Sequence, residues 1–232
     1  MLTAMSGVDP NDPGSLDLPV PDFTRQMAQH NHPPRIGLPR EYFAETATAE
    51  VWAHTKQVAQ RLADAGAEIV ELSLPDTFAS CHSAQRIVMH VECAAYHERF
   101  YRERADDYGP RIRSAIEMGL IMPASKYIQA QRLRRQFRDD MVDMVRQVDV
   151  VMTPATVSPA PKDLNTTGDA AFQVPWTSSG LPTVVVPSGL SELGLPMAVQ
   201  FGALPYEEGK LLGAAQWCEQ ALGVSLCPPG YD

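Results

Sequence analysis

The sequence predicts an α/β protein in which helices flank a partial mixed β-sheet, and three observations support this class. Short β-branched runs bounded by proline and glycine are typical of buried strands, and two such runs lie at residues 183–186 and 197–201. Several longer stretches repeat apolar residues at helical spacing. The order strand, helix, strand at residues 35–74 predicts parallel pairing through a right-handed crossover.

The chain is expected to begin with an extended surface connection over residues 1–34, because its first 32 residues are rich in proline, aspartate and glycine. Within it, residues 1–6 are predicted to be the last turns of a helix that Gly7 caps. Residues 35–232 are expected to form one layered α/β domain. Its first strands are predicted at residues 35–38 and 68–74, on either side of a helix that Gly66 ends.

Two longer helices are predicted at residues 77–104 and 124–147, because each carries an apolar stripe consistent with one buried face. A buried strand follows at residues 149–153, and a final helix is expected at residues 206–222. Before the strand at 183–186, residues 175–180 are expected to form an open loop. Pro182 and Pro187 are expected to set where that strand begins and ends.

Composition argues against nucleic acid as a partner. The net charge is −9, whereas phosphate binding draws on a positive surface. The arginine-rich run at residues 132–138 is a local exception. Because Asp139, Asp140 and Asp143 follow it at helical distances, we interpret the run as a solvated, ion-paired helix face.

The sequence also predicts a cytoplasmic protein without a membrane anchor. No apolar run approaches the ~20 residues that a membrane helix needs, and the N-terminus lacks the pattern of a signal peptide. The four cysteines show no C-x-x-C spacing. Reduced thiols are therefore expected.

None of the ionisable residues forms an evident catalytic or metal-binding motif. The four lysines lie on amphipathic helices, at a helix start or in a proline-rich loop, so none is expected to be the buried base that lysine catalysis needs. His90 and His97 on one helix would lie about 10.5 Å apart, too far to share one metal ion. No metal and no cofactor are predicted.

The segment 174–201 carries the most specific pattern in the chain. It contains, in order, Pro175-Trp176, Gly180-Leu181-Pro182, Val186-Pro187-Ser188-Gly189, Gly194-Leu195-Pro196 and Gln200. This ordered set resembles the C-terminal half of the amidase signature family of serine amide hydrolases, and the match extends over almost the whole chain. The resemblance implies the C-terminal part of an amidase-signature-like fold.

The resemblance also implies a reaction, the hydrolysis of a carboxamide to a carboxylic acid and ammonia. Family members use a Ser–cis-Ser–Lys arrangement, in which the lysine and a bridging serine activate the nucleophilic serine. Those elements lie upstream of the equivalent of Met1, so no catalytic residue is expected in this chain. Ser178 and Ser179 match loop positions of the family and not its nucleophile. The chain is therefore expected to supply scaffold and one wall of the substrate pocket, and to be inactive alone.

By the same resemblance, the loop before the Gly-Leu-Pro strand and the end of the Thr-Pro strand face the catalytic serines. Five residues are the expected substrate-binding positions: Thr153, Trp176, Thr177, Gly180 and Tyr127. For Trp176 two interpretations stand side by side. Its indole stacks on the acyl group of the substrate, or it fills the core beneath the loop.

Alternatives of a different class stay open. The chain is either part of a general amidase, which we favour over the tRNA-dependent amidotransferase subunit, or a non-catalytic binding or assembly protein that retains the scaffold. A third possibility is that Met1 is an internal methionine of a longer protein. The expected partners are a small-molecule amide, if an N-terminal half complements the chain, and a partner chain or second copy that covers an exposed sheet edge.

Overall fold

Two compact units make up the chain in the computed structural model, which describes residues 1–227. The first unit combines residues 1–73, residues 145–172 and the chain from residue 181 onward, and it contains the β-sheet. The second unit combines residues 74–144 and 173–180 and is helical.

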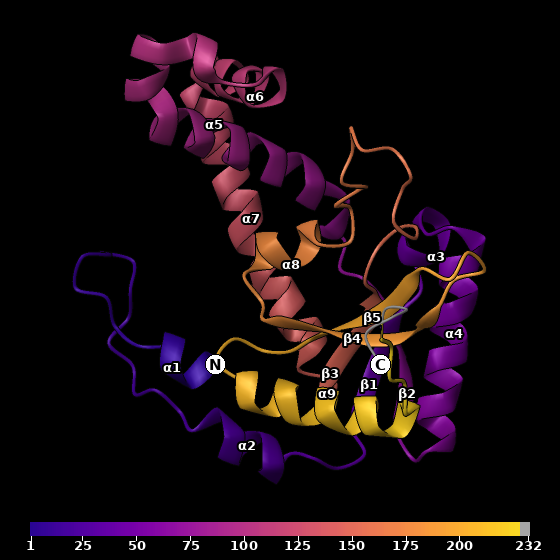
Figure 1. Ribbon diagram of the computed structural model, residues 1–232. Helices are drawn as coiled ribbons and strands as arrows, with labels where there is room; N and C mark the ends of the chain where they lie inside the picture. The colour runs from indigo at the N-terminus through magenta and orange to yellow at the C-terminus, as the bar shows by residue number, and fades with distance from the viewer. Residues whose placement is uncertain (228–232) are drawn as a thin grey trace. The chain divides into compact units, whose positions relative to one another are not determined.

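Among its described residues, the first unit contains one five-stranded mixed sheet with the strand order β2-β1-β3-β5-β4 (Figure 1). The strands are β1 Arg35–Pro39, β2 Glu68–Leu72, β3 Val150–Pro154, β4 Thr183–Leu190 and β5 Pro196–Gly202. Strand β1 runs parallel to β2 and to β3, whereas β5 pairs antiparallel with both β3 and β4. The predicted mixed sheet and its parallel β1–β2 pair are confirmed.

Helix α4, Ala49–Asp64, is the crossover between β1 and β2. It begins at Thr48, whose hydroxyl accepts a hydrogen bond from the Val51 backbone N–H at 3.3 Å. It ends before Gly66, which has a positive φ of 112° that favours glycine. The predicted end of this helix at Gly66 is confirmed.

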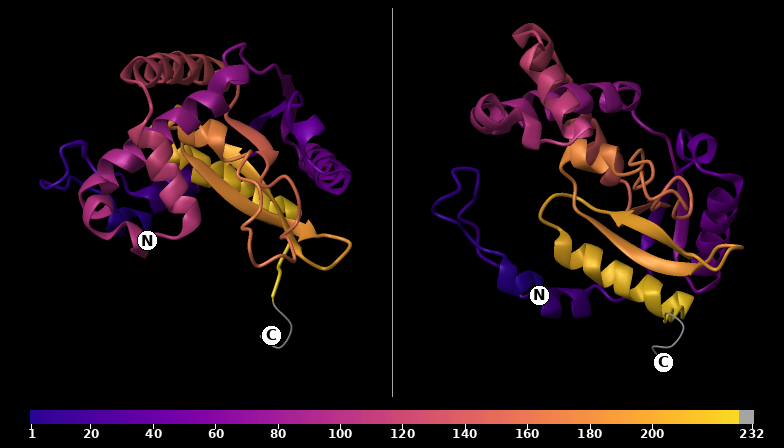
Figure 2. Two further views of the ribbon diagram at one scale, coloured as in Figure 1. Left: turned by 90° about the horizontal axis from the view of Figure 1, so that it is seen from above. Right: turned by 45° about the horizontal axis from the view of Figure 1, so that its top comes forward.

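The main core of the first unit lies between one face of the sheet and two helices, α4 and α9 (Glu208–Leu222). Alternate strand residues point to this face. Figure 2 shows α9 running alongside β4 and β5. The largest fully buried side chains of this core are Ile36, Val58, Leu62, Met152 and Phe201.

The N-terminal segment is partly helical, which differs from the extended connection predicted for residues 1–34. Short helices lie at α1 Leu2–Met5 and α2 Phe23–Gln29, and a third, α3 Phe43–Thr46, follows β1. Helix α2 packs against α9, where a Cβ on Gly213 would lie 2.8 Å from the Met27 carbonyl oxygen. Helix α1 ends at Ser6 in extended conformation, and not at Gly7 as predicted.

Strand β4 differs from its prediction in two ways. It is an edge strand whose residues alternate between buried and exposed, so it is not deep in the sheet. It also runs past Pro187, which pairs with Ala198, to Leu190, with a register shift between Pro187 and Gly189. A proline is accommodated because an edge strand leaves every second N–H without a ladder partner.

The second unit contains four α-helices and a short 3-10 turn among its described residues. They are α5 Phe78–Arg104, η1 Ala105–Asp107, α6 Pro110–Leu120, α7 Ala124–Val145, whose last residue belongs to the first unit, and α8 Val174–Ser179. Helices α5 and α6 lie side by side (Figure 1). The two long helices were predicted, whereas α6 and α8 were not.

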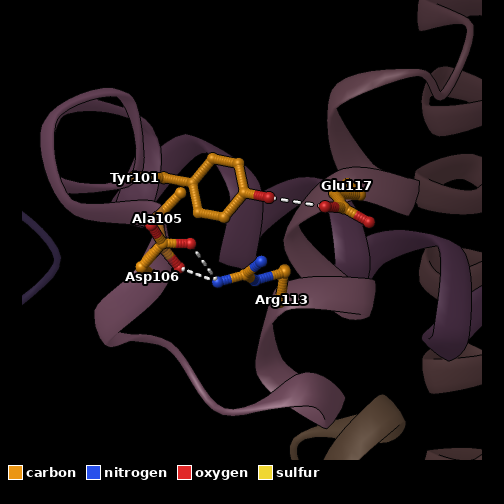
Figure 3. Close-up of polar contacts among 5 residues, drawn as sticks. All are labelled: Tyr101, Ala105, Asp106, Arg113 and Glu117. Atoms are coloured by element: carbon orange, nitrogen blue, oxygen red, sulfur yellow. Dashed lines mark hydrogen bonds and ion pairs between the residues drawn. The ribbon is translucent and has the colours of Figure 1, made fainter.

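Polar contacts fasten the turn between α5 and α6, as Figure 3 shows. The Arg113 guanidinium donates to the Ala105 carbonyl oxygen at 2.7 Å and to Asp106 at 3.1 Å. The Tyr101 hydroxyl donates to Glu117 at 2.6 Å, and this hydrogen bond raises the pKa of the Tyr101 phenol. The chain reversal is thereby held by side chains from both helices.

In the part of the chain that the structure describes, no helix combines the length and the apolar character that crossing a bilayer requires.

Candidate functional site

Residues 174–179 form helix α8, where a loop was predicted. Pro175 lies in the first helical turn, where its missing N–H has no intrahelical partner to lose. Gly180 ends the helix in left-handed conformation with φ 69°, and its N–H donates to the Trp176 carbonyl at 2.8 Å. The prediction of a loop was wrong because the proline and glycine that suggested it are the start and stop signals of a short helix.

The two serines of α8 differ in how their hydroxyls are used. The Ser179 hydroxyl donates to the Pro175 carbonyl at 2.8 Å and also lies 3.1 Å from the Trp176 carbonyl oxygen. The Ser178 hydroxyl is buried and has no hydrogen-bond partner within the described residues. Ser179 therefore satisfies its own helix, whereas Ser178 keeps an unused donor.

A hollow of about 230 Å³ lies beside these serines within the second unit. Its lining comes from α7 and from the C-terminal end of α8: Gln131, Arg134, Arg135, Arg138, Ser178, Ser179 and Gly180. The Arg134 side chain joins the two helices, because its Nε donates to the Ser178 carbonyl at 2.9 Å. The described lining includes three arginines and no carboxylate, so the charge of the hollow is positive.

The arginine run does not form the ion-paired face that the sequence predicted. Within residues 1–227, none of the four arginines at 132, 134, 135 and 138 makes an ion pair. Asp140 instead accepts a hydrogen bond from the Thr77 hydroxyl at 2.6 Å. The order of the residues also disfavours ion pairs, because the aspartates follow the arginines along the helix. An i,i+4 pair is weaker when the base precedes the acid than when the acid precedes the base.

Tyr127 and Gly180 are predicted site residues that lie at or near this hollow. Gly180 lines it directly. The Tyr127 hydroxyl donates to Glu92 on α5 at 3.2 Å and accepts from Gln131 at 2.8 Å. Gln131 also lines the hollow, so Tyr127 contacts its wall through one hydrogen bond.

Trp176 and Thr177 are not among the described residues that line the hollow. The Trp176 side chain is 4% exposed, and its indole N–H has no hydrogen-bond partner within the described residues. Thr177 is exposed. Of these two neighbours on α8, Trp176 is therefore buried and Thr177 is exposed.

Thr153 belongs to the first unit, in strand β3. It is fully buried on the sheet face opposite the core between β3 and the helices, because Val150 and Met152 point to that core. Its cross-strand neighbour on β5 is Gln200. The Thr153 hydroxyl oxygen and the Gln200 amide nitrogen are both buried without a hydrogen-bond partner within residues 1–227.

Sequence reasoning missed two features of these surroundings. Gln200 entered only as a motif position, although an amide within an apolar strand is itself a sign of a buried polar group. The arginines of α7 were interpreted as a solvated, ion-paired face, and the hollow that three of them line was not predicted. Their spacing of i+3, i+4 and i+7 from Gln131 places all the described lining residues of α7 on one helix face, which was the available signal.

The lysines show no buried base. Lys56, Lys126 and Lys162 are exposed, and Lys210 lies 3.0 Å from the Asp149 carboxylate. The pKa of Asp149 is lowered. Burial opposes this shift, but the Arg35 backbone N–H and the Lys210 ammonium together outweigh it. Within residues 1–227, no three His, Cys, Asp or Glu side chains gather where they could hold a metal ion.

A serine–histidine contact that was not predicted lies in the first unit. His54 Nε2 on α4 is 2.7 Å from the Ser188 hydroxyl on β4, and this hydroxyl also donates to the Met197 carbonyl at 3.3 Å. Ser188 is 2% exposed. A nucleophile must meet its substrate, and Ser188 is buried, so we interpret this contact as a link between α4 and β4.

Fold and site together define an α/β protein built on a mixed sheet, with a short helix that ends at a Gly-Leu-Pro turn. Residues 1–212 match the family model described as Amidase. The chain belongs to the amidase signature family.

Relatives of two kinds are similar to this chain. A glutamyl-tRNA(Gln) amidotransferase subunit of Azorhizobium caulinodans is 33% identical over an alignment of 255 positions. The alignment covers 96% of this chain and 52% of the relative. An amidase of Pseudomonas putida is 32% identical over 240 residues, 95% of this chain and 50% of the relative. The chain therefore spans about half the length of these relatives.

Solved structures share the fold. A chain from a vestigial protein complex, described as revealing the evolutionary origins of an s-triazine catabolic enzyme, aligns with a TM-score of 0.82 at 28% identity. The alignment covers 96% of this chain and 50% of that one. The 6-aminohexanoate cyclic dimer hydrolase aligns with a TM-score of 0.78 at 20% identity, which supports the fold alone.

Proposed function

We propose that this chain supplies the scaffold and one pocket wall of an amidase that hydrolyses carboxamides, and that it does not hydrolyse amides alone. The proposal rests on the share of its relatives that the chain covers. The chain matches relatives named as amidases or amidotransferase subunits, yet spans only about half of each. A second half would then supply the groups that attack the amide.

The state of the serines and lysines supports the proposed inactivity. The Ser179 hydroxyl is engaged with the carbonyls of its own helix. Among the four lysines, three are exposed and one is ion-paired, so none is in the desolvated state that a lysine base requires. Ser188, which has a histidine partner in His54, is buried.

We assign the pocket wall to the five residues that the family resemblance indicates, Thr153, Trp176, Thr177, Gly180 and Tyr127. Two of them carry buried polar atoms that lack a hydrogen-bond partner within the described residues, the Thr153 hydroxyl and the Trp176 indole N–H. Buried polar groups are normally satisfied, and an unsatisfied one fits a position where substrate or another chain segment supplies the partner.

Ammonia release tests the proposal. The purified 232-residue chain is incubated with simple aliphatic and aromatic amides, alone and after co-expression with the N-terminal half of the Pseudomonas putida amidase. We expect no release above background from the chain alone and measurable release from the complemented pair. Release by the chain alone that Ser179→Ala abolishes would contradict the proposal.

The pocket wall is tested in the complemented pair by comparing two tryptophans. Trp176→Phe is expected to raise KM severalfold with a smaller change in kcat, because an aromatic wall binds the acyl part of ground state and transition state alike. The matched control is Trp217→Phe, a half-buried tryptophan on α9. Equal changes in KM for the two substitutions would show that Trp176 is not part of the pocket wall.

A non-catalytic assembly protein is the second proposal. One structural neighbour is described as part of a vestigial protein complex, which is the observation that favours it. A chain that is monodisperse by itself, and that gains no amidase activity from an added N-terminal half, would support this alternative over the first.

A further inference from the structure

We propose that the hollow between α7 and α8 is a binding site for a small oxyanion of the phosphate class. The site lies within the second unit and is built from the guanidinium groups of α7 and the C-terminal end of α8. Binding there does not require that the chain take part in amide hydrolysis.

Uncompensated charge is the first feature of the hollow that favours an anion. Arg134, Arg135 and Arg138 line it, and none of them makes an ion pair within residues 1–227. The protein as a whole is acidic, with a net charge of −9, so a group of three arginines without ion pairs differs from the rest of the chain. Guanidinium groups present forked donors that match phosphate oxygens in pairs.

Part of the site is also fixed before any ligand binds. Arg134 Nε donates to the Ser178 carbonyl at 2.9 Å. Because a guanidinium has five N–H donors, this bond leaves the others for a ligand. It also satisfies a carbonyl at the C-terminal end of α8, where the partial negative charge would otherwise oppose an anion.

An unused donor is the third feature of the hollow. Ser178 lines it, is 2% exposed, and its hydroxyl has no partner within the described residues. The Ser179 hydroxyl beside it is already engaged. A buried hydroxyl without a partner is unfavourable, so a ligand that reaches it would gain its hydrogen bond.

Size restricts the ligand to a small group. The hollow measures about 230 Å³, below the ~300–1,000 Å³ typical of pockets for drug-sized molecules. Three cations around such a volume favour an anion with two charges over a singly charged carboxylate. Inorganic phosphate is therefore the probe of choice.

Calorimetric titration of the purified chain with inorganic phosphate tests the site, with acetate at equal ionic strength for comparison. We expect saturable binding of phosphate, weaker at high salt because Arg135 and Arg138 are exposed. Arg135→Gln and Arg138→Gln are each expected to weaken binding about tenfold. Absence of saturable phosphate binding, or acetate binding of equal strength, would overturn the proposal.

Arg132→Gln is the matched control, because Arg132 is exposed on the same helix, has no ion pair within residues 1–227 and is not among the described lining residues. It removes the same charge and should change affinity less than about twofold. Equal weakening by Arg132→Gln and Arg138→Gln would mean nonspecific attraction and would also overturn the site. If a glutamine variant fails to fold by circular dichroism, Arg138→Lys carries the same test, since it retains the charge and loses the fork.

Discussion

Gly119 on α6 lies against the backbone of α5. A Cβ at this position would be 2.0 Å from the His90 carbonyl oxygen and 2.6 Å from the Ala94 Cβ. Both partners belong to a helix, so they cannot move aside as a flexible side chain could. A single hydrogen in place of a methyl group therefore sets how closely α5 and α6 approach.

Gly119→Ala is accordingly expected to lower the free energy of unfolding, by about 2 kcal/mol. Helix propensity by itself would give the opposite sign, since alanine is favoured over glycine by about 1 kcal/mol in a helix interior. Urea denaturation followed by circular dichroism measures the change. Ser114→Ala on the exposed face of α6 is the control and should leave the midpoint within error. A stabilised Gly119→Ala protein would show that α5 and α6 are not in this contact.

Single residues also show the limit of sequence reasoning. The arginines of α7 could be recognised as a cluster, but their partners could not. Arg134 bonds to Ser178, 44 positions later, and the expected acid at Asp140 is taken by Thr77, 63 positions earlier. Local spacing carries no information about contacts at such separations, so the predicted ion pairs were wrong, although Arg132, Arg135 and Arg138 are exposed as expected.

At the scale of elements, His54 and Ser188 join helix α4 to the edge strand β4. The fit is close, because a Cβ on Gly189 would lie 2.9 Å from His54 Cε1. Desolvation lowers the pKa of His54, the nearby Arg61 guanidinium lowers it further, and Glu50 partly opposes both. The neutral imidazole is the form that the folded protein prefers.

The lowered pKa has a defined consequence for stability. The folded state binds the proton of His54 less readily than the unfolded state. The contribution of His54 to the free energy of unfolding is therefore present above its unfolded-state pKa of about 6.5, and it is lost as pH falls through its folded-state pKa. We therefore expect the melting temperature to fall as pH is lowered from about 7 to about 5, and less steeply in His54→Gln. Melting curves followed by circular dichroism provide the measurement.

The control for this prediction is Gln57→Ala, which changes an exposed, non-titrating residue on the same helix and should leave the slope unchanged. Identical slopes in wild type and His54→Gln would exclude His54 as the group that titrates.

Elements were predictable where their signals are local. The helices α4, α5, α7 and α9 and the strands around them follow from periodicity and from stop signals such as Gly223, which ends α9 in left-handed conformation with φ 58°. Helix α6 was missed, and α8 was taken for a loop. Both are short and begin with a proline in the first turn, and in a short segment that proline resembles a turn signal.

At the scale of the molecule, the sheet formed by the described residues of the first unit ends in two edges, β2 and β4. Strand β4 presents Val185 and Leu190, which are 51% and 53% exposed. An exposed apolar edge strand can pair with another strand from a second copy or a partner. This edge is therefore where we expect the chain to associate.

Val185→Lys is expected to reduce self-association of the purified chain while leaving its circular dichroism spectrum unchanged. A lysine at an edge position must be desolvated if another strand pairs there, which disfavours the contact. Sedimentation velocity over a concentration series measures the effect. Leu164→Lys adds the same charge at a fully exposed loop residue outside the sheet. Comparable effects of the two substitutions would point to net charge and not to the edge.

The sequence by itself determined the family and the α/β class, because both depend on short-range patterns: the ordered Gly-Leu-Pro and Pro-Ser-Gly motifs, and the periods of helices and strands. Only the tertiary structure decided that β4 is an edge strand, that α8 ends beside the arginines of α7, and that α6 packs on α5 through Gly119. These features join residues far apart in the chain, and such contacts are settled by packing of the whole unit, which local propensity does not encode.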